Sequence, residues 1–442
     1  MPIYAKLAEK VFVIFSLVFF TGGFIPHIPF GSPISPIIPL IPFIIQTIVS
    51  ILIILRWKKV LRLVIKEKLL WILMAIVIAS AIASDQPMLA FYRPENFHSL
   101  AFGVIPLLQV TLFGVYFAAR YSLKDQLEIL AWVFGIVAIS SLVVGAVLPK
   151  YGVMGRGNVI TLEDYVHTGA WRGIFVHKQA LGSTMLLSVL IFLFFTTSNN
   201  RTQRWIGWTG FSISVELIIL TNGKSALVIL LTLLILIPLY RALRWNYKLV
   251  LPFFIIIVLV GGGLATLLTA NLETILGALG KDATLSGRTE FWPSILEKMW
   301  ERPWLGYGYG VFWRGWEGPS ADIWYINRIK PTHAHNGFLN IALSFGLLGL
   351  GVFLLSFLTT CLQGVIWIRL TKTAEGLAPL LYLTYMVLPN ITESYLMQED
   401  IFWILYVTTV LSMHNKSINL IKSEELFSDK ELRVGLGREA RV

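Results

Sequence analysis

Residues Leu127–Leu148 read LEILAWVFGIVAISSLVVGAVL, an apolar run in which Glu128 is the only charged side chain. A helix needs roughly 20 apolar residues to cross the hydrocarbon core of a bilayer, and this run has that length. Similar runs recur along the chain. With 56% hydrophobic residues, 14% charged residues and a mean hydropathy of +0.73, the composition lies outside the range of soluble globular proteins.

The runs predict an all-α polytopic membrane protein with about twelve transmembrane helices. The last two runs are short, and the first is expected to be a retained span rather than a signal peptide, because it has no small-residue cleavage site. In chain order the expected spans are Lys10–Pro26, Ile37–Leu55, Leu69–Ser84, His98–Ala118, Leu127–Leu148, Gly173–Thr197, Trp205–Thr221, Ser225–Tyr240, Leu249–Leu268, Gly337–Thr360, Leu377–Pro389 and Ile401–Met413.

The chain divides accordingly into four parts. Residues 1–268 hold spans one to nine, 269–336 form one large polar loop, 337–413 hold spans ten to twelve, and 414–442 form a polar tail. Lys and Arg concentrate in the short loops on the side of the N-terminus, which predicts that both termini are cytoplasmic and the large loop lies outside. The net charge of +11 is mostly this topology signal, with some attraction to membrane lipid, and does not indicate a nucleic-acid partner.

The large loop carries the pattern of an amphipathic helix. Apolar side chains recur at helical spacing, with Pro293 expected in the first turn, at Phe291, Trp292, Ile295, Leu296, Met299 and Trp300. Such a helix either lies along the membrane interface with its Trp residues as anchors, or packs on the ends of the spans. In both cases it holds Arg288, just before its expected start, close to the headgroup plane.

Glycines alternate with aromatic residues from Gly306 to Gly318. Aromatic faces pair with the apolar faces of sugars, and glycines let the backbone approach a ligand closely. Trp304, Tyr307 and Tyr309 are therefore candidate substrate-binding residues. The alternative is an irregular loop that caps the helical bundle.

Two histidines and an asparagine, His333, His335 and Asn336, precede the span that begins at Gly337. The positive end of the helix dipole at this position disfavours a protonated imidazole, so His335 is a candidate base. We favour His335 over His333 because it abuts the asparagine and the helix. Both His333 and Asn336 are candidate substrate-binding residues, and the alternative role for this group is a helix cap.

Cations occupy the outer ends of two other spans. Arg172, His177 and Lys178 lie at the start of the span Gly173–Thr197, and Lys224 lies in a tight turn just before the span Ser225–Tyr240. Cations at this depth either extend to the interface or meet an anion, so all four are candidate anion-binding residues. Glu216, about mid-span, is expected to be buried and to pair with Lys178 or Lys224.

Several catalytic motifs are absent. The sequence has no Asp-x-Asp, no Gly-x-x-x-x-Gly-Lys and no His-Glu-x-x-His. The carboxylates on the outer side show no metal-ligand spacing, so we expect chemistry without a metal or cofactor, with arginine as the cationic element. The single cysteine, Cys361, excludes a disulfide within the chain.

Three motifs in this order resemble the O-antigen ligase and polymerase superfamily of bacterial membrane glycosyltransferases, which includes the exopolysaccharide polymerases. The resemblance covers about Pro149 to Phe357, and the first 140 residues match only as apolar spans. The motifs are WRGIFVHK at Trp171–Lys178, SGRTEFW at Ser286–Trp292 and HAHNGFL at His333–Leu339, supported by PWLGYG at Pro303–Gly308.

The resemblance implies a GT-C-like fold in the bacterial cytoplasmic (inner) membrane, with the large loop in the periplasm. It implies that a glycan carried on undecaprenyl diphosphate is transferred with inversion, without a metal, to a hydroxyl of a saccharide or lipid-linked saccharide acceptor. Arg172 and Arg288 would hold the diphosphate, and His335 would accept the acceptor proton. This sequence departs from the family pattern at His177 and Lys178, which would add a third anion contact.

Other functions remain open at this point. A ligase moves a finished glycan onto another acceptor, whereas a polymerase joins lipid-linked repeat units for O-antigen or exopolysaccharide, and the motifs do not separate the two. A transporter of lipid-linked sugars would show an internal repeat between halves of the chain, and none is visible. A purely structural role in an export complex leaves the arginines and histidines without a purpose.

Overall fold

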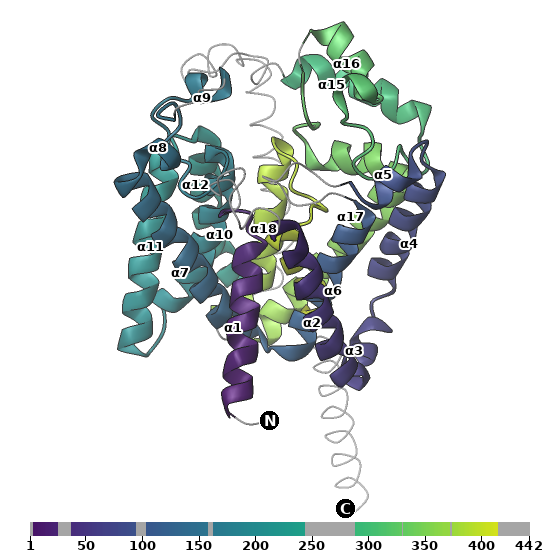
Figure 1. The fold of residues 1–442 in the computed structure, drawn as a ribbon. Helices are drawn as coiled ribbons and strands as arrows, with labels where there is room; N and C mark the ends of the chain where they lie inside the picture. Colours follow the sequence, from purple (N-terminus) through teal and green to yellow (C-terminus); the bar gives the residue numbers. More distant parts are fainter. Residues whose placement is uncertain are drawn as a thin grey trace, which may run out of the picture.

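The fold is all helical, as the sequence predicts (Figure 1). The computed structural model describes residues 3–24, 37–93, 103–157, 162–243, 288–328, 330–371 and 374–413. Within these ranges the only β-feature with both partners described is an isolated antiparallel bridge between Val153 and Trp171.

A helix lies in every expected span except residues 249–268, which fall outside the described ranges, as does the tail at 414–442. The elements in chain order are α1 (Ile3–Phe19), η2 (Ile38–Leu40), α2 (Ile41–Leu55), α3 (Trp57–Val64), α4 (Lys68–Ala83), α5 (Pro87–Phe91), α6 (Val104–Arg120), α7 (Leu123–Val147), α8 (Pro149–Gly152), α9 (Leu162–Val166), α10 (Lys178–Thr196), α11 (Arg201–Leu220), α12 (Lys224–Ala242), α15 (Arg288–Glu301), η4 (Gly315–Glu317), α16 (Ser320–Asn327), α17 (Gly337–Leu370), η5 (Ala374–Leu377), α18 (Ala378–Val387), η6 (Pro389–Ile391) and a final helix, Ile401–Met413.

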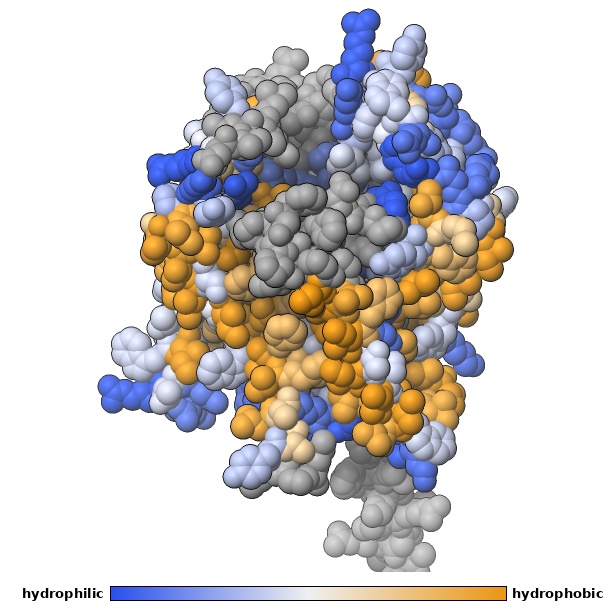
Figure 2. All heavy atoms as spheres, in the orientation of Figure 1, coloured by the Kyte–Doolittle hydropathy of each residue, from blue (hydrophilic) through white to orange (hydrophobic). Residues whose placement is uncertain are grey.

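The described helices are those of an integral membrane protein. Four of them, α7, α10, α12 and α17, are long and apolar enough to cross a bilayer, and α2 with α3 makes a fifth if the two, bent by 94°, count as one span. Shorter apolar helices are α4, α6 and Ile401–Met413. Figure 2 shows apolar side chains in a band around the middle of the visible face and hydrophilic ones towards both ends. The number of twelve spans stays a prediction.

A buried carboxylate ties the first helix into the bundle. Glu9 on α1 is 6% exposed, and its two oxygens accept hydrogen bonds from Arg120 at 3.0 and 3.1 Å. Tyr116 donates to the same carboxylate at 2.6 Å, and Arg56 lies 2.8 Å from it. One side chain therefore joins α1 to α6 and to the α2–α3 junction. Glu216, in contrast, is exposed on α11, so the expectation of a buried pair there is wrong.

The described part of the large loop forms a small layer with its own apolar core at one end of the bundle, where α15 and α16 lie (Figure 1). Phe291, Ile295 and Met299 on α15 pack against residues of α16 and the first turns of α17. Leu296 and Trp300 remain exposed on the opposite side of α15. The helix thus packs on the end of a span, the second of the two predicted alternatives. Its described range begins at Arg288, so Pro293 lies inside the helix rather than in its first turn.

The glycine-rich loop after α15 fills a break in α17. At Gly346, φ is +68° and ψ is −173°, which interrupts the helix. The carbonyls that the break leaves without helical partners accept from the loop: Tyr307 N–H reaches Leu343 O at 2.8 Å, and Gly308 N–H reaches Ser344 O at 3.0 Å. A Cβ on Gly346 would collide with the backbone of Trp304, so glycine is required by this close approach.

Candidate active site at the start of α17

His335 lies at the N-terminus of α17 in a conformation that side chains rarely adopt. Asn336 is the N-cap residue, and its Oδ1 accepts from the N–H groups of Phe338 and Leu339 at 3.0 and 3.1 Å. His335 has φ of +47°, the left-handed region, which costs about 1–2 kcal/mol for a residue with a Cβ. Its N–H donates to Nδ1 of His333 at 3.1 Å. Asn336 is therefore a cap, and His335 is the strained residue of the motif.

A turn between η6 and the final helix brings a carboxylate to the two histidines. Asn390 organises this turn: its Oδ1 accepts from the N–H groups of Tyr395 and Leu396 at 2.7 and 3.0 Å. A Cβ on Gly337 would collide with the Asn390 side chain, so this glycine lets the turn approach the start of α17. The turn carries Glu393, whose N–H donates to Pro389 O at 2.9 Å.

Glu393 faces both histidines. Its Oε2 lies 3.6 Å from Nδ1 of His335 and 4.0 Å from Nε2 of His333. Gln179 in the first turn of α10 donates to its Oε1 at 2.6 Å. Nδ1 of His335 is buried and has no hydrogen-bond partner within the usual limits, so Glu393 Oε2 is the acceptor placed to take its proton.

The first turns of α15 cover the same histidines. Trp292 donates from Nε1 to Ala334 O at 3.1 Å, and the ring of Phe291 lies edge-on to His335 with the ring centroids 6.3 Å apart. Arg288, three and four residues before this pair, is the first residue of α15. The side chain of Arg288 is outside the described part of the structure, but its helix begins beside His335.

A polar cavity of about 540 Å³ adjoins the cluster. Glu393 and Gln179 lie in its wall, so the cavity and the histidine cluster share one carboxylate. Two predicted anion-binding residues line it as well: Lys178 from the first turn of α10 and Lys224 from the first turn of α12. The segments around α10, α12 and the Glu393 turn, far apart in the sequence, thus meet at one site.

His177 and Arg172, predicted to bind anions, instead make contacts that build the wall. His177 is the N-cap of α10 and accepts from Gln179 N–H through Nδ1 at 3.3 Å. Arg172 donates to Tyr151 O at 2.7 Å and to Asp164 at 3.2 Å, and it does not line the cavity. Its guanidinium joins α8 to α9, so its role in this structure is to hold the segment that leads to Lys178.

The tyrosines of the glycine-aromatic stretch are packing groups. Tyr307 is 4% exposed and donates to Glu301 at 2.7 Å, and burial followed by this bond raises the pKa of its phenol. Tyr309 is also 4% exposed, stacks on Phe345 and donates to Met397 O at 2.7 Å. Buried rings present no face to a sugar, so the substrate-binding expectation for these two gives way to the loop-cap alternative. Trp304 alone of the three is exposed.

The donor set of His333, His335 and Glu393 is of the kind that binds zinc, and one atom from each lies within 4.8 Å of the others. The hydrogen bond to His333 opposes this use. Because Nδ1 of His333 accepts the His335 N–H, the neutral ring carries its proton on Nε2, the nitrogen that faces Glu393. A metal at that nitrogen would displace the proton and break the bond, so the geometry fits a hydrogen-bonded cluster better than a ligand set.

Motif reasoning missed Glu393. It lies beyond the last motif, in a short segment between two apolar runs, and no fixed spacing links it to the histidines. The sequence signal for Glu393 was its position as an acidic residue near the predicted outer end of a span. Glu399 and Asp400 have the same signal, so it does not single out Glu393. In the structure Glu399 instead accepts from Gly103 N–H, and Asp400 caps the final helix through Phe402 and Trp403.

Comparison with known proteins agrees with the motifs. Residues 209–354 match the family model described as O-antigen ligase, a range that includes Lys224, Arg288 and His335. The chain is 28% identical over 193 residues to the exopolysaccharide production protein ExoQ of Rhizobium meliloti (strain 1021). That alignment covers 41% of this chain and 44% of ExoQ, so the chain spans less than half the length of this curated relative. Both matches support the resemblance to the O-antigen ligase and polymerase superfamily.

Proposed function

We propose that this integral membrane protein, which resembles O-antigen ligases and exopolysaccharide polymerases, is an inverting glycosyltransferase without a metal. It moves a glycan from undecaprenyl diphosphate to an acceptor hydroxyl at the periplasmic face of the bacterial inner membrane. The observation that carries the proposal is the meeting of His335 and Glu393 beside a cavity lined by Lys178 and Lys224.

His335 acts as the general base. With the proton of Nδ1 directed to Glu393, Nε2 keeps a lone pair and takes the proton of the acceptor hydroxyl. The acceptor oxygen then forms its bond to the anomeric carbon as the bond from that carbon to the diphosphate breaks. Glu393 stabilises the imidazolium that results and fixes the ring orientation, as a buried carboxylate does for the histidine of serine proteases.

Cations stabilise the diphosphate as it leaves. Lys178 and Lys224 supply positive charge in the cavity, and Arg288 supplies a planar guanidinium from the helix beside His335. Arg172 contributes indirectly by holding the segment before α10. Trp304 is the remaining candidate for contact with sugar. This arrangement gives the leaving group cationic partners without a metal ion.

A polymerase of lipid-linked repeat units is the second candidate. The name of the relative, an exopolysaccharide production protein, favours it, whereas the description of the family model favours a ligase. Both reactions use the same donor and the same base. A transporter of lipid-linked sugars forms no new glycosidic bond and so needs no general base such as His335.

Reconstitution tests the proposal. The purified chain in proteoliposomes receives a defined undecaprenyl-diphosphate oligosaccharide with a core-lipid acceptor or with a second repeat unit, and the products are read by mass. A single addition to the core lipid identifies a ligase, and a ladder of repeats identifies a polymerase. We expect the product to form equally with EDTA present. If the donor crosses the bilayer and no new glycosidic bond forms, the protein is a transporter and not a glycosyltransferase.

Arg288→Lys is expected to lose most of the transfer activity. The compact ammonium of lysine does not replace the planar guanidinium of arginine, which binds two phosphate oxygens at once. Loss of one such donor raises the activation barrier by about 3–4 kcal/mol, as in oxyanion-hole deletions. The measurement is the initial rate with saturating donor. Arg328→Lys, in the same layer after α16, is the matched control and should keep normal turnover. Normal turnover of Arg288→Lys would remove Arg288 from the mechanism.

Glu393→Gln is expected to slow transfer by at least about tenfold, and by up to about 10⁴-fold if the His335 tautomer changes. Donor affinity should be unchanged, because the cations of the cavity remain. The rate at saturating donor is compared with donor binding, and Glu393→Asp should recover part of the rate. Glu317→Gln, an exposed carboxylate of the same layer, is the control. Equal rates for Glu393→Gln and the native chain would show that Glu393 does not orient the base.

A further inference from the structure

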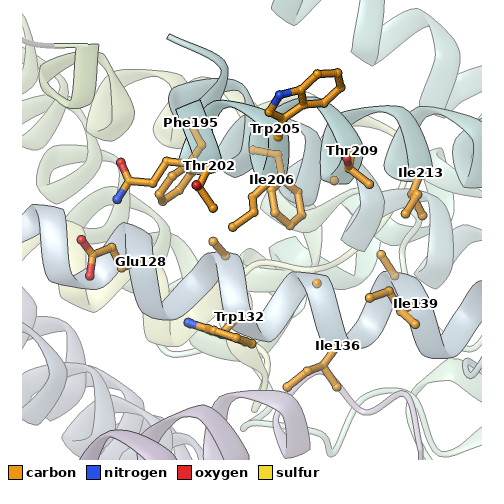
Figure 3. A pocket seen from close by; sticks show the side chains of 16 residues that line it. Glu128, Trp132, Ile136, Ile139, Phe195, Thr202, Trp205, Ile206, Thr209 and Ile213 are labelled. Carbon is orange, nitrogen blue, oxygen red and sulfur yellow. The ribbon is translucent and has the colours of Figure 1, made fainter. Parts of the chain in front are cut away.

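A second cavity lies near the C-terminal end of α10, between α7 and α11 with α10 as its floor, whereas the first cavity borders the N-terminal end of α10 (Figure 3). Its volume is about 610 Å³. Gly135 on α7 has no side chain to fill the groove, and Phe192 of α10 closes the floor, packed against Gly210 of α11, where a Cβ would collide with its ring. The lining is almost entirely apolar, so water is a poor occupant and hydrocarbon a good one.

The groove opens at one end into a polar cavity of about 300 Å³. The two share Glu128, Phe195 and Gln203 in their walls, so they are continuous. Among the described residues, the polar cavity also has one cation, Lys124, and a second carboxylate, Glu375. A long apolar groove that ends in a charged chamber matches an amphiphile with one chain and one polar head.

The dimensions match a single bilayer leaflet. From Glu128 to Ile139 along α7, and from Gln203 to Ile213 along α11, a helix rises about 15–16 Å. This is about half of the roughly 30 Å hydrocarbon core. Trp132 and Trp205 are exposed on the two sides of the groove near its polar end, the level at which tryptophan marks the membrane interface (Figure 3). A phospholipid acyl chain fits this length, and a polyprenyl chain exceeds it.

The site lies away from the proposed transfer site. α7 begins at Leu123 beside the polar chamber and ends at Val147, next to α8, which Arg172 contacts at the other end. Ligand binding in the groove is therefore separable from the reaction at His335.

The charges select the headgroup. The chamber holds two carboxylates and one ammonium, with Lys10 of α1 at 3.9 Å from Glu128. With Lys10 counted, the described carboxylates and ammonium groups around the chamber balance, two of each, so a head that carries both charges matches them better than a purely anionic head. We propose that this groove and chamber bind a phosphatidylethanolamine-type phospholipid of the leaflet on the side of the N-terminus: Lys124 takes its phosphate, Glu128 and Glu375 take its primary ammonium, and the α7–α11 groove takes one acyl chain.

Native mass spectrometry of the delipidated full chain tests this assignment. Phosphatidylethanolamine, phosphatidylcholine, phosphatidylglycerol and undecaprenyl phosphate are added separately and in competition. We expect phosphatidylethanolamine to bind most tightly, because only its head combines a phosphate with an ammonium that donates hydrogen bonds. Equal or tighter binding of phosphatidylglycerol, or displacement by undecaprenyl phosphate, would overturn the proposal.

Variants locate the lipid. Glu375→Gln should weaken phosphatidylethanolamine binding about tenfold, the scale of one lost charged hydrogen bond. Gly135→Leu places a side chain in the groove and should weaken binding of every diacyl lipid. The substitution should not disturb the fold, because a Cβ at this position makes only an ordinary van der Waals contact with Phe192. Glu216→Gln, exposed on the same α11 and outside both cavities, is the control and should bind as the native chain does. Unchanged binding by both Glu375→Gln and Gly135→Leu would place the lipid elsewhere.

Discussion

His335→Ala is expected to abolish transfer while leaving the donor bound. The general-base contribution to an enzymatic rate is typically about 10²- to 10⁴-fold, and of the two histidines His335 lies closer to Glu393, at 3.6 Å against 4.0 Å for His333. Lys178 and Lys224 remain in the cavity, so donor affinity should change little. Initial rates and binding of the lipid-linked donor are measured in the same proteoliposomes.

Two further variants make this result specific. His335→Asn keeps a residue type that tolerates positive φ, so it should fold normally and still be inactive. His333→Ala removes the neighbouring ring but leaves the base in place, and it should keep a substantial part of the rate. An inactive His333→Ala together with an active His335→Ala would show that the base is His333.

Glu9→Gln is expected to produce the largest loss of stability among single polar substitutions in the described part of the chain. Removal of one partner from a largely buried, hydrogen-bonded charge cluster costs up to about 3–5 kcal/mol, and the remaining charges, Arg56 and Arg120, are only 20% and 26% exposed. Here the guanidinium groups of Arg56 and Arg120 would both lose their carboxylate. The measurement is thermal unfolding of the purified chain in detergent.

The matched control is Glu128→Gln on α7, whose contact with Lys10 is a partly exposed pair at 3.9 Å. Pairs of this kind contribute about 0–1 kcal/mol, so its unfolding temperature should move little. If Glu9→Gln and Glu128→Gln unfold at the same temperature, the Glu9 cluster does not hold α1 to the bundle. Retained transfer by Glu9→Gln at low temperature would show that the effect is on folding rather than on chemistry.

The helical class and the positions of the apolar helices could be predicted from sequence, because the length and composition of an apolar run are local properties. The predicted helix near Phe291 and the cap role open for Asn336 are also found, since helical spacing and capping depend on residues only a few positions apart. The motifs led to the superfamily for the same reason: each is a short contiguous stretch.

Other predictions differ from the structure because they depended on which residues from distant parts of the chain pack against a given side chain. Glu216 looked buried because it is central in its run, yet it points away from the bundle. Tyr307 and Tyr309 looked like ligand-binding aromatics, yet the break of α17 at Gly346 draws their loop into the interior. Arg172 looked free to bind an anion, yet its Nε and Nη1 donate to Tyr151 and Asp164, and it does not line the cavity.

The sequence by itself determined a helical membrane protein with its chemistry concentrated in a few motifs near one predicted face, because hydrophobic run length, charge bias and capping signals act over short distances. Only the tertiary structure decided which groups meet. Glu393 reaches His335 from another part of the chain because Gly337 admits the Asn390 turn, and Gln179 joins them from α10. Such contacts follow from the packing of helices distant in sequence, which no local pattern encodes.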